Sequence, residues 1–272
     1  MKIHRTLVAL VALALTGLAP ARAADAVPLT AGSTVTRELG GGAETAFHVD
    51  AEAGQFVYAI VDQRGIDVRV SVTGPDGGTV VEVENTDGPR GPEYLAWIAS
   101  ATGRYTLTAR ALNKDAAGGR LDVRLVERRA ARPDDERRVL AFRRFAEGTV
   151  LMVRDQRDAF PQSKAAYEEA RAIWRELGDA AGEARALKRV GECMYLMGER
   201  RASRDVFVEA IPLAERGGER IELGIIVTNL ARVDRFLGDA DAALAGLSRG
   251  MEIFRAEEHP YQQALVMSVL VN

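Results

Sequence analysis

Cysteine is nearly absent from this sequence, which contains one, Cys193, among 272 residues. A single thiol cannot form a disulfide within the chain, so an internal disulfide is excluded. Cys193 lies between Glu192 and Met194 in a helical pattern. We therefore interpret it as a small, half-buried hydrophobic residue and not as a nucleophile.

The sequence motifs that carry enzyme chemistry are also missing. We find no glycine-rich phosphate loop, no zinc-ligand spacing and no paired acidic residues, and the acids of the turns lack the dense spacing of a calcium loop. Residues 246–250 match the G-x-S-x-G pattern of a nucleophile elbow. Ser248 falls in a helical pattern, however, whereas an elbow needs a strand before a sharp turn. We expect no enzyme activity, no catalytic residue, no metal and no cofactor.

Long hydrophobic runs are limited to the amino terminus. The basic start Met1–Arg5 is followed by an apolar run from Leu7 to Leu18 and by the small-residue motif ending at Ala23, which is typical of a signal peptide. The run is roughly a dozen residues long, whereas a bilayer span needs about 20. We predict a signal peptide over residues 1–23, cleavage after Ala23, no membrane span and a periplasmic or secreted location.

The charge balance gives no sign of a polyanionic partner. The chain has 36 basic and 39 acidic residues, and cleavage after Ala23 removes Lys2, Arg5 and Arg22 but no acid, which leaves 33 against 39, a net charge of −6. A mildly acidic surface does not favour nucleic acid or an anionic membrane. We expect neither as a partner.

Residues 24–130 have the pattern of an antiparallel β-sandwich. Short alternating segments rich in β-branched residues recur about every ten residues, with turn residues between them. The seven predicted strands are 45–49, 55–61, 68–72, 79–83, 94–98, 103–108 and 121–126. The hairpin signal Asp76-Gly77 separates two of them, because this pair readily adopts the positive φ of a tight turn.

This part of the chain resembles a known bacterial module. The motifs Ala53-Gly-Gln-Phe-Val-Tyr, Gly74-Pro-Asp-Gly and Thr102-Gly-Arg-Tyr-Thr-Leu are similar to those of the pre-peptidase C-terminal type of β-sandwich. Some relatives of that module engage substrates. Trp97 is therefore either a core residue, which its apolar neighbours favour, or a sugar-stacking platform.

Residues 134–272 have a helical pattern that repeats every 40 residues. The pattern changes near residue 130, which marks the expected domain boundary, and the array stops inside the first helix of a fourth unit. Four columns show the repeat: Tyr167, Phe207, Leu247; Ala170, Ala210, Gly250; Val150, Val190, Leu230, Leu270; and Leu151, Gly191, Ala231, Val271. A helical hairpin that borrows its core from its neighbours explains this spacing. The expected fold is an antiparallel β-sandwich followed by an α-solenoid.

The helical units resemble the tetratricopeptide repeat. Val190-Gly191 match the large and small residues of its first helix, and Ser203, Phe207 and Ala210 match its second helix. The unit is longer than the common one of 34 residues, and Leu151 stands where the family has glycine. The resemblance implies a concave groove, lined by the first helix of each unit, that holds a peptide or a partner helix.

The register of the repeat predicts which residues line that groove. We expect this face to be net basic, and Asn229 to occupy a position where the family binds a peptide backbone. The alternative is that these residues are solvated helix faces. The predicted groove residues are Arg185, Lys188, Glu192, Tyr195, Thr228, Asn229, Arg232 and Arg235.

The combination of export signal, sandwich and repeats resembles the front of bacterial CHAT-domain proteins, in which a caspase-like protease domain follows the repeats. No residue here matches that domain. We therefore expect an exported scaffold for an unidentified protein or peptide. Two alternatives stay open: the regulatory part of a protease whose catalytic domain lies downstream, and a carbohydrate-binding sandwich on a helical stalk.

Overall fold

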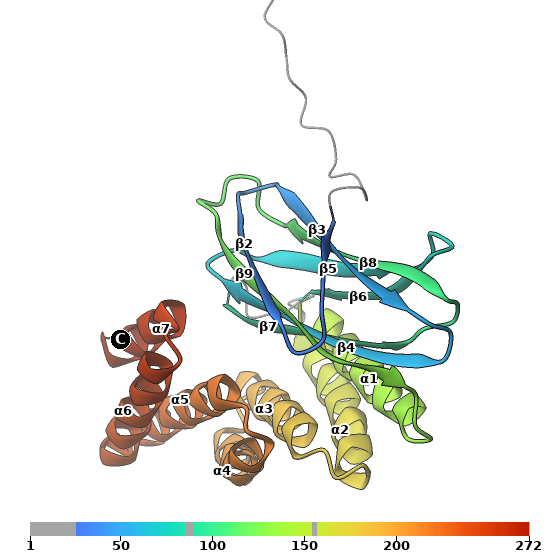
Figure 1. Cartoon of the computed structure of the whole chain (residues 1–272). Helices are drawn as coiled ribbons and strands as arrows, with labels where there is room; N and C mark the ends of the chain where they lie inside the picture. The colour runs from blue at the N-terminus through green and yellow to red at the C-terminus, as the bar shows by residue number, and fades with distance from the viewer. Residues whose placement is uncertain (1–25, 85–89, 154–156, 272) are drawn as a thin grey trace, which may run out of the picture.

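The computed structural model describes residues 26–84, 90–153 and 157–271, and within them an all-β part is followed by an all-α part, which confirms the expected fold class (Figure 1). The predicted signal peptide lies outside the described residues. The strands are β1 (Val27–Pro28), β2 (Thr34–Leu39), β3 (Glu44–Ala51), β4 (Gln55–Arg64), β5 (Val68–Thr73), β6 (Thr79–Glu84), β7 (Arg90–Ile98), β8 (Gly103–Ala111) and β9 (Gly119–Ala130). The helices are α1 (Asp135–Val153), the short 3-10 turn η2 (Arg157–Ala159), α2 (Phe160–Glu176), α3 (Ala180–Leu196), α4 (Arg200–Gly217), α5 (Arg220–Leu237), α6 (Ala240–Ala256) and α7 (Pro260–Val271).

The strands form two sheets, which pack face to face. One sheet has the order β1-β3-β8-β5-β6 and the other β2-β9-β4-β7, and every neighbouring pair is antiparallel except β1 with β3. Alternate side chains such as Val68, Val70 and Val72 are fully buried between the sheets. Trp97 is 2% exposed and lies against Tyr105, with ring centroids 6.0 Å apart. Trp97 is thus a core residue, as its apolar neighbours indicated.

The helices form antiparallel pairs that repeat along the chain. The second helices α2, α4 and α6 begin at residues 160, 200 and 240, and the first helices α3, α5 and α7 begin at residues 180, 220 and 260, so both series advance by 40 residues. Asp179 and Asp239 directly precede α3 and α6 and cap them, since each carboxylate accepts a hydrogen bond from the backbone nitrogen three residues on.

Glycine allows the two helices of a pair to approach closely. A Cβ added at Gly191 of α3 would lie 2.8 Å from the Phe207 ring of α4, and one added at Gly148 of α1 would lie 2.8 Å from the Tyr167 ring of α2. The Ser203 hydroxyl donates to the Gly191 carbonyl at 2.7 Å, as that of Ser163 does to Gly148 at 2.6 Å. Gly148 is therefore the structural equivalent of Gly191.

This equivalence shows that the sequence-based alignment of the first helix is wrong by three residues. That alignment placed Val150 and Val190 at equivalent positions of the repeat, but Val150 is 49% exposed and Val190 is 1% exposed. The physical reason is the link between α1 and α2, which contains the extra turn η2 and is longer than the link between α3 and α4. The apparent departure at Leu151 is a consequence of this insertion. The side chains of Leu270 and Val271 are not described.

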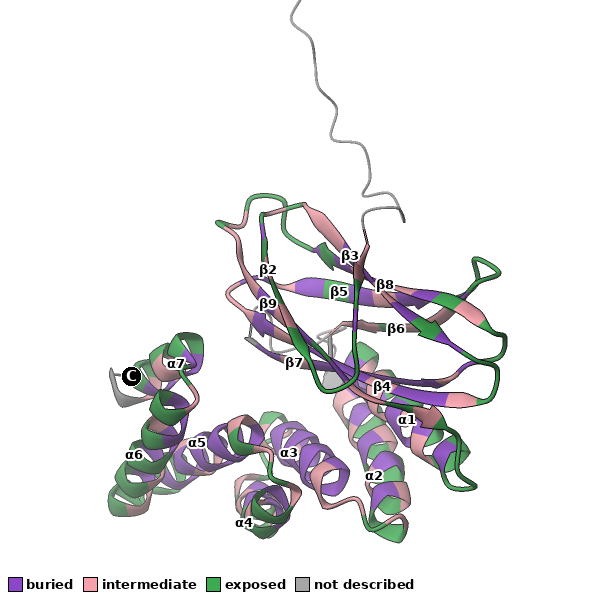
Figure 2. Ribbon diagram, viewed as in Figure 1, coloured by how far each residue is buried: buried purple, intermediate pink, exposed green. Residues whose placement is uncertain are grey.

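The helices follow an arc, and the sandwich lies on the inner side of that arc (Figure 1). The first helices face the sandwich, and the second helices α2, α4 and α6 form the outer layer. Figure 2 shows α3 buried over most of its length, whereas much of α4 and α6 is exposed. At the start of the arc α1 packs on β7. Beside this contact, the rings of Tyr58 of β4 and Phe142 of α1 lie 5.3 Å apart within a shared hydrophobic cluster. The sandwich and the helices therefore share a core.

Candidate interaction site on the inner face of the helices

The inner face of the array consists of the sides of α1, α3 and α5 that point toward the sandwich. Along these helices the sandwich covers one part and leaves the other exposed. We call the first part the covered half; it contains Phe142, Phe145, Arg185 and Lys188. We call the second part the open half; it contains Tyr195, Arg232, Arg235 and Phe236.

Arg185 joins the helices to the sandwich. Its guanidinium carbon lies 3.6 Å from the centroid of the Tyr94 ring of β7, and its Nη2 lies 3.0 Å from Glu219 Oε1. The Tyr94 hydroxyl donates to Glu219 Oε2 at 3.3 Å. Burial and the nearby carboxylates raise the pKa of Tyr94 well above its ordinary value, so the phenol keeps its proton. Arg185, which is 2% exposed, is committed to the sandwich rather than presented to solvent.

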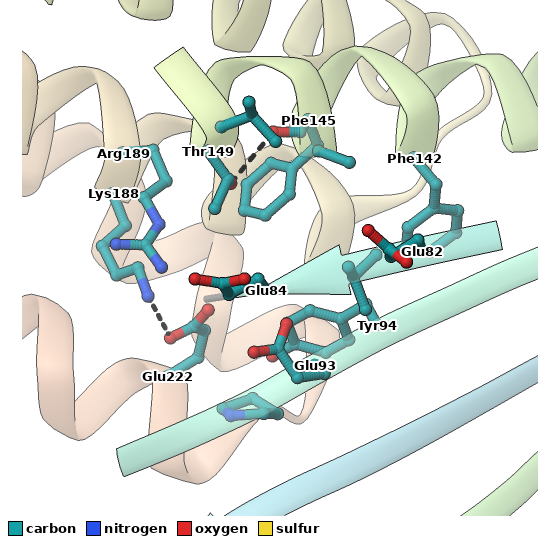
Figure 3. Close-up of a pocket in the computed structure, with 14 residues that line it drawn as sticks. Glu82, Glu84, Glu93, Tyr94, Phe142, Phe145, Thr149, Lys188, Arg189 and Glu222 are labelled. Atoms are coloured by element: carbon teal, nitrogen blue, oxygen red, sulfur yellow. Dashed lines mark hydrogen bonds and ion pairs between the residues drawn. The ribbon is translucent and has the colours of Figure 1, made fainter. Parts of the chain in front are cut away.

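Lys188 is also buried, and its ion-pair partner lies on α5. Its Nζ lies 3.0 Å from Glu222 Oε2, and both side chains are almost completely buried. The pair borders a narrow cavity of about 30 Å³, and Figure 3 shows Lys188 and Glu222 joined between α3 and α5, with Glu84 and Tyr94 on the strand side. This volume holds about one water molecule, which is too little for a peptide.

A wider groove lies beside this cavity, between the edge strand β6 and helix α1. Its volume is about 570 Å³, and most of its lining is apolar. Val80, Val81 and Val83 form the strand side, and Ala146 and Val150 form the helix side. This groove is open to solvent, but nothing on its surface identifies an occupant.

A buried bridge separates the covered half from the open half. Glu192 accepts one hydrogen bond from Arg189 and one from the Asn229 amide, both at 2.9 Å. One hydrogen of the Asn229 side-chain nitrogen is therefore already in use. This nitrogen carries two hydrogens, so Glu192 fixes the orientation of the amide and leaves one hydrogen for another acceptor.

Thr228 points away from the inner face. Its hydroxyl donates to the Gly224 carbonyl at 2.8 Å, and a Cβ added at Gly250 of α6 would lie 2.5 Å from it. The repeat placed Thr228 in the same column as Lys188, but the structure uses it for contact between α5 and α6. It is not among the residues that the open half presents.

The open half contains an aromatic pair surrounded by arginines. The rings of Tyr195 and Phe236 meet edge to face, with centroids 6.4 Å apart. Arg200 lies over both rings, at 3.8 Å and 4.4 Å from their centroids, and Arg232 lies over Tyr195 at 4.7 Å. We call Tyr195, Arg200, Arg232 and Phe236 the arginine–aromatic cluster. Arg235, beside it, donates to the Val269 carbonyl of α7 at 3.0 Å.

Sequence reasoning missed two members of this cluster, Arg200 and Phe236. Arg200 begins the second helix α4, and the groove prediction considered first helices alone. Phe236 follows Arg235 directly and is 63% exposed. The sequence does carry a signal for Phe236: it is a large aromatic residue near the end of a first helix, and it lies outside the columns of the repeat that form the core.

The described residues contain no group of three or more His, Cys, Asp or Glu side chains that could hold a metal ion. In the same residues, no helix is both long and apolar enough to span a bilayer. Ser248, from the G-x-S-x-G match, lies in the middle of α6.

Comparisons with known proteins find partial likenesses in fold. No protein-family model matches this sequence, and a search of curated proteins finds no match. Among solved structures, the periplasmic inhibitor of g-type lysozyme from Aeromonas hydrophila is 15% identical over 37% of this chain and 95% of its own, with a TM-score of 0.29. The pre-peptidase C-terminal domain of a collagenase from Bacillus anthracis is 15% identical over 37% of this chain and 93% of its own, with a TM-score of 0.28. BtubC (BKLC) from P. vanneervenii is 16% identical over 50% of this chain and 63% of its own, with a TM-score of 0.38.

Proposed function

We propose that this chain is an exported interaction scaffold, which holds a peptide or a partner helix against the inner face of its helices. The observation that carries the proposal is the open half. There the arc presents an exposed aromatic side chain, Phe236, among arginines that the sandwich does not cover. Exposed aromatic and arginine side chains are enriched where proteins bind one another.

The same proposal assigns the helical part to the tetratricopeptide type. Its support is the 40-residue advance of both helix series and the matching contacts at Gly148 and Gly191. The assignment of the β-part to the pre-peptidase C-terminal type, and the likeness to the front of CHAT-domain proteins, are proposals that rest on the sequence motifs. Export rests on the predicted signal peptide over residues 1–23.

Burial of two predicted groove residues supports a narrower proposal for where a ligand would bind. Arg185 and Lys188 are buried against the sandwich and Glu222, so a peptide lying across both would have to displace the sandwich. A peptide on the open half would not. We therefore place the ligand along Tyr195, Arg232 and Phe236.

Site-specific crosslinking tests this placement. Peptides are first selected from a random display library on the whole chain. Benzoylphenylalanine is then introduced at Phe236, and in a second variant at Leu244 of the outer layer, which is 55% exposed. We expect selected peptides to crosslink to the variant at Phe236 and not to the variant at Leu244.

Two results would contradict the proposal. One is a selection that enriches no peptide over a scrambled control. The other is a set of peptides that crosslink equally from both positions, since this would mean that the outer layer binds as well as the inner face.

A further inference from the structure

Within the described residues, the arginines of the open half and Arg200 beside them have no acidic partner. Arg200 and Arg232 make no ion pair with any residue in the described ranges, and Arg235 donates to a neutral carbonyl. Arg200 Nε and Nη1 and Arg232 Nε are buried without a hydrogen-bond partner. Buried donors of this kind are normally satisfied in native proteins. In the part of the chain that the structure describes, three arginines at one end of the inner face therefore have no acidic partner.

The covered half differs in its ion pairs, although Arg185 Nε is also buried without a hydrogen-bond partner. There Arg185 pairs with Glu219 and Lys188 pairs with Glu222, so each cation has a carboxylate from α5 or the turn before it. Between the halves, Glu192 neutralises Arg189. Among the described residues of α3, α4 and α5, the arginines without an acidic partner thus include those of the part that the sandwich leaves exposed.

The aromatic rings hold the two arginines in place before any ligand binds. Arg200 lies against Tyr195 and Phe236, and Arg232 lies on Tyr195. The stacking buries part of each guanidinium group but leaves Arg200 Nη2 and both terminal nitrogens of Arg232 available for hydrogen bonds to carboxylates. Because the side chains are already ordered, less conformational entropy is lost when a carboxylate binds.

We propose that the arginine–aromatic cluster is the recognition site for an acidic peptide segment. This inference rests on the proposed function and specifies its ligand. Carboxylate side chains would pair with Arg200 and Arg232, and an apolar side chain of the same segment would cover the exposed ring of Phe236. A long nucleic acid fits less well, because the chain has 39 acidic against 36 basic residues and would repel a polyanion beyond the cluster.

Fluorescence anisotropy with a labelled twelve-residue peptide of Glu, Ala and Phe tests the proposal on the whole chain. The control probe has Gln in place of every Glu. We expect the acidic peptide to bind at low salt and to weaken with salt, and we expect Arg200→Glu and Arg232→Glu each to raise its Kd by at least about tenfold. Arg201→Glu is the matched control, because Arg201 is the exposed neighbour of Arg200 and is outside the cluster. It should change the Kd by less than about twofold.

Each contrary result is informative. Equal binding of the Gln peptide, equal loss in Arg201→Glu, or no binding of the acidic peptide overturns the acidic specificity. If neutral selected peptides still crosslink to the variant at Phe236, the scaffold function stands without the acidic specificity. If no peptide crosslinks there, the scaffold function and the acidic specificity both fail. Preferred binding of a single-stranded oligonucleotide of equal charge assigns the cluster to nucleic acid instead. Should a charge reversal lower helicity in circular dichroism, Arg200→Gln and Arg232→Gln replace it, with the same tenfold criterion.

Discussion

Asp135 connects the last strand of the sandwich to the first helix. Its carboxylate accepts hydrogen bonds from Arg129 of β9, at 2.5 Å and 3.0 Å, and from the Arg132 backbone nitrogen at 2.6 Å. Burial alone would raise the pKa of Asp135, but the hydrogen bonds from Arg129 and Arg132 outweigh it and hold the pKa below its ordinary value. The folded state thus favours the charged carboxylate.

Asp135→Asn should therefore lower the free energy of unfolding by about 1–3 kcal/mol at neutral pH. A carboxyl whose folded pKa is depressed contributes its full stability above the unfolded pKa of about 3.9. That contribution is lost as the pH falls through the lower, folded pKa. Urea denaturation at several pH values should show the difference between the two proteins shrinking in acid.

Asp134→Asn is the control, because Asp134 is the exposed neighbour of Asp135. We expect its effect to stay within about 0.5 kcal/mol. An equal loss in both variants, or a difference for Asp135→Asn that does not change with pH, would show that the contacts with Arg129 do not stabilise the fold.

The helical elements show how far sequence reasoning reaches. The constant spacing of small and aromatic residues predicted α3 to α6, because each unit buries the same contacts. It could not place α1, because a fixed spacing of 40 residues cannot account for the extra residues before Phe160. Strands β1 and β2 were also missed, because Thr34–Leu39 alternates mostly exposed and half-buried positions and lacks a strong apolar face.

The candidate site was harder to predict, because partners distant in sequence form it. Arg185 lies on the side of α3 that faces the sandwich, yet no local pattern reveals that Tyr94 lies against it. The same holds for Arg200, which reaches Phe236 from another helical pair. Repeat spacing predicts contacts between neighbouring helical units. It cannot predict contacts with the sandwich, because the sandwich is not part of the repeat.

At the scale of the helical pair, Gly191→Ala should destabilise the protein. On an exposed helix this change would add about 1 kcal/mol of stability. Here the new Cβ would lie 2.8 Å from the Phe207 ring, which is fully buried and has little room to move. We expect a net loss of about 1–3 kcal/mol, measured by chemical denaturation.

A double-mutant cycle separates this clash from other causes. Phe207→Leu removes part of the ring, so Gly191→Ala should be better tolerated in that background than in the parent chain. If its effect is the same in both backgrounds, the close approach of α3 and α4 is not the reason for the glycine.

At the scale of the whole molecule, several contacts join the sandwich to the helices. The sandwich contacts the helices at α1, at the starts of α3 and α5, and at the α6–α7 link, where Arg64 donates to the Glu258 carbonyl at 3.4 Å. A Cβ on Gly65 would overlap the Tyr261 ring. These contacts explain why the inner face is only partly available.

Arg185→Ala should loosen this arrangement without unfolding either part. It removes a buried ion pair and the stacking on Tyr94, at a loss of about 3 kcal/mol. Hydrogen exchange should become faster in β7 and in the first turns of α3, and the radius of gyration should increase. Arg137→Ala, which removes an exposed pair with Glu176, is the control; equal changes in both variants would mean that Arg185 does not hold the sandwich in place.

The contact between the β4–β5 turn and the α6–α7 link also constrains how the protein can vary. It joins residues 194 positions apart, and the arc between them has to match the width of the sandwich. Each added helical pair would carry Glu258 and Tyr261 one step further along the arc and away from Arg64 and Gly65. The diameter of the β-part therefore limits the number of repeats that can close around it. A variant with an inserted repeat would lose the contact with the sandwich either at α1 or at the α6–α7 link.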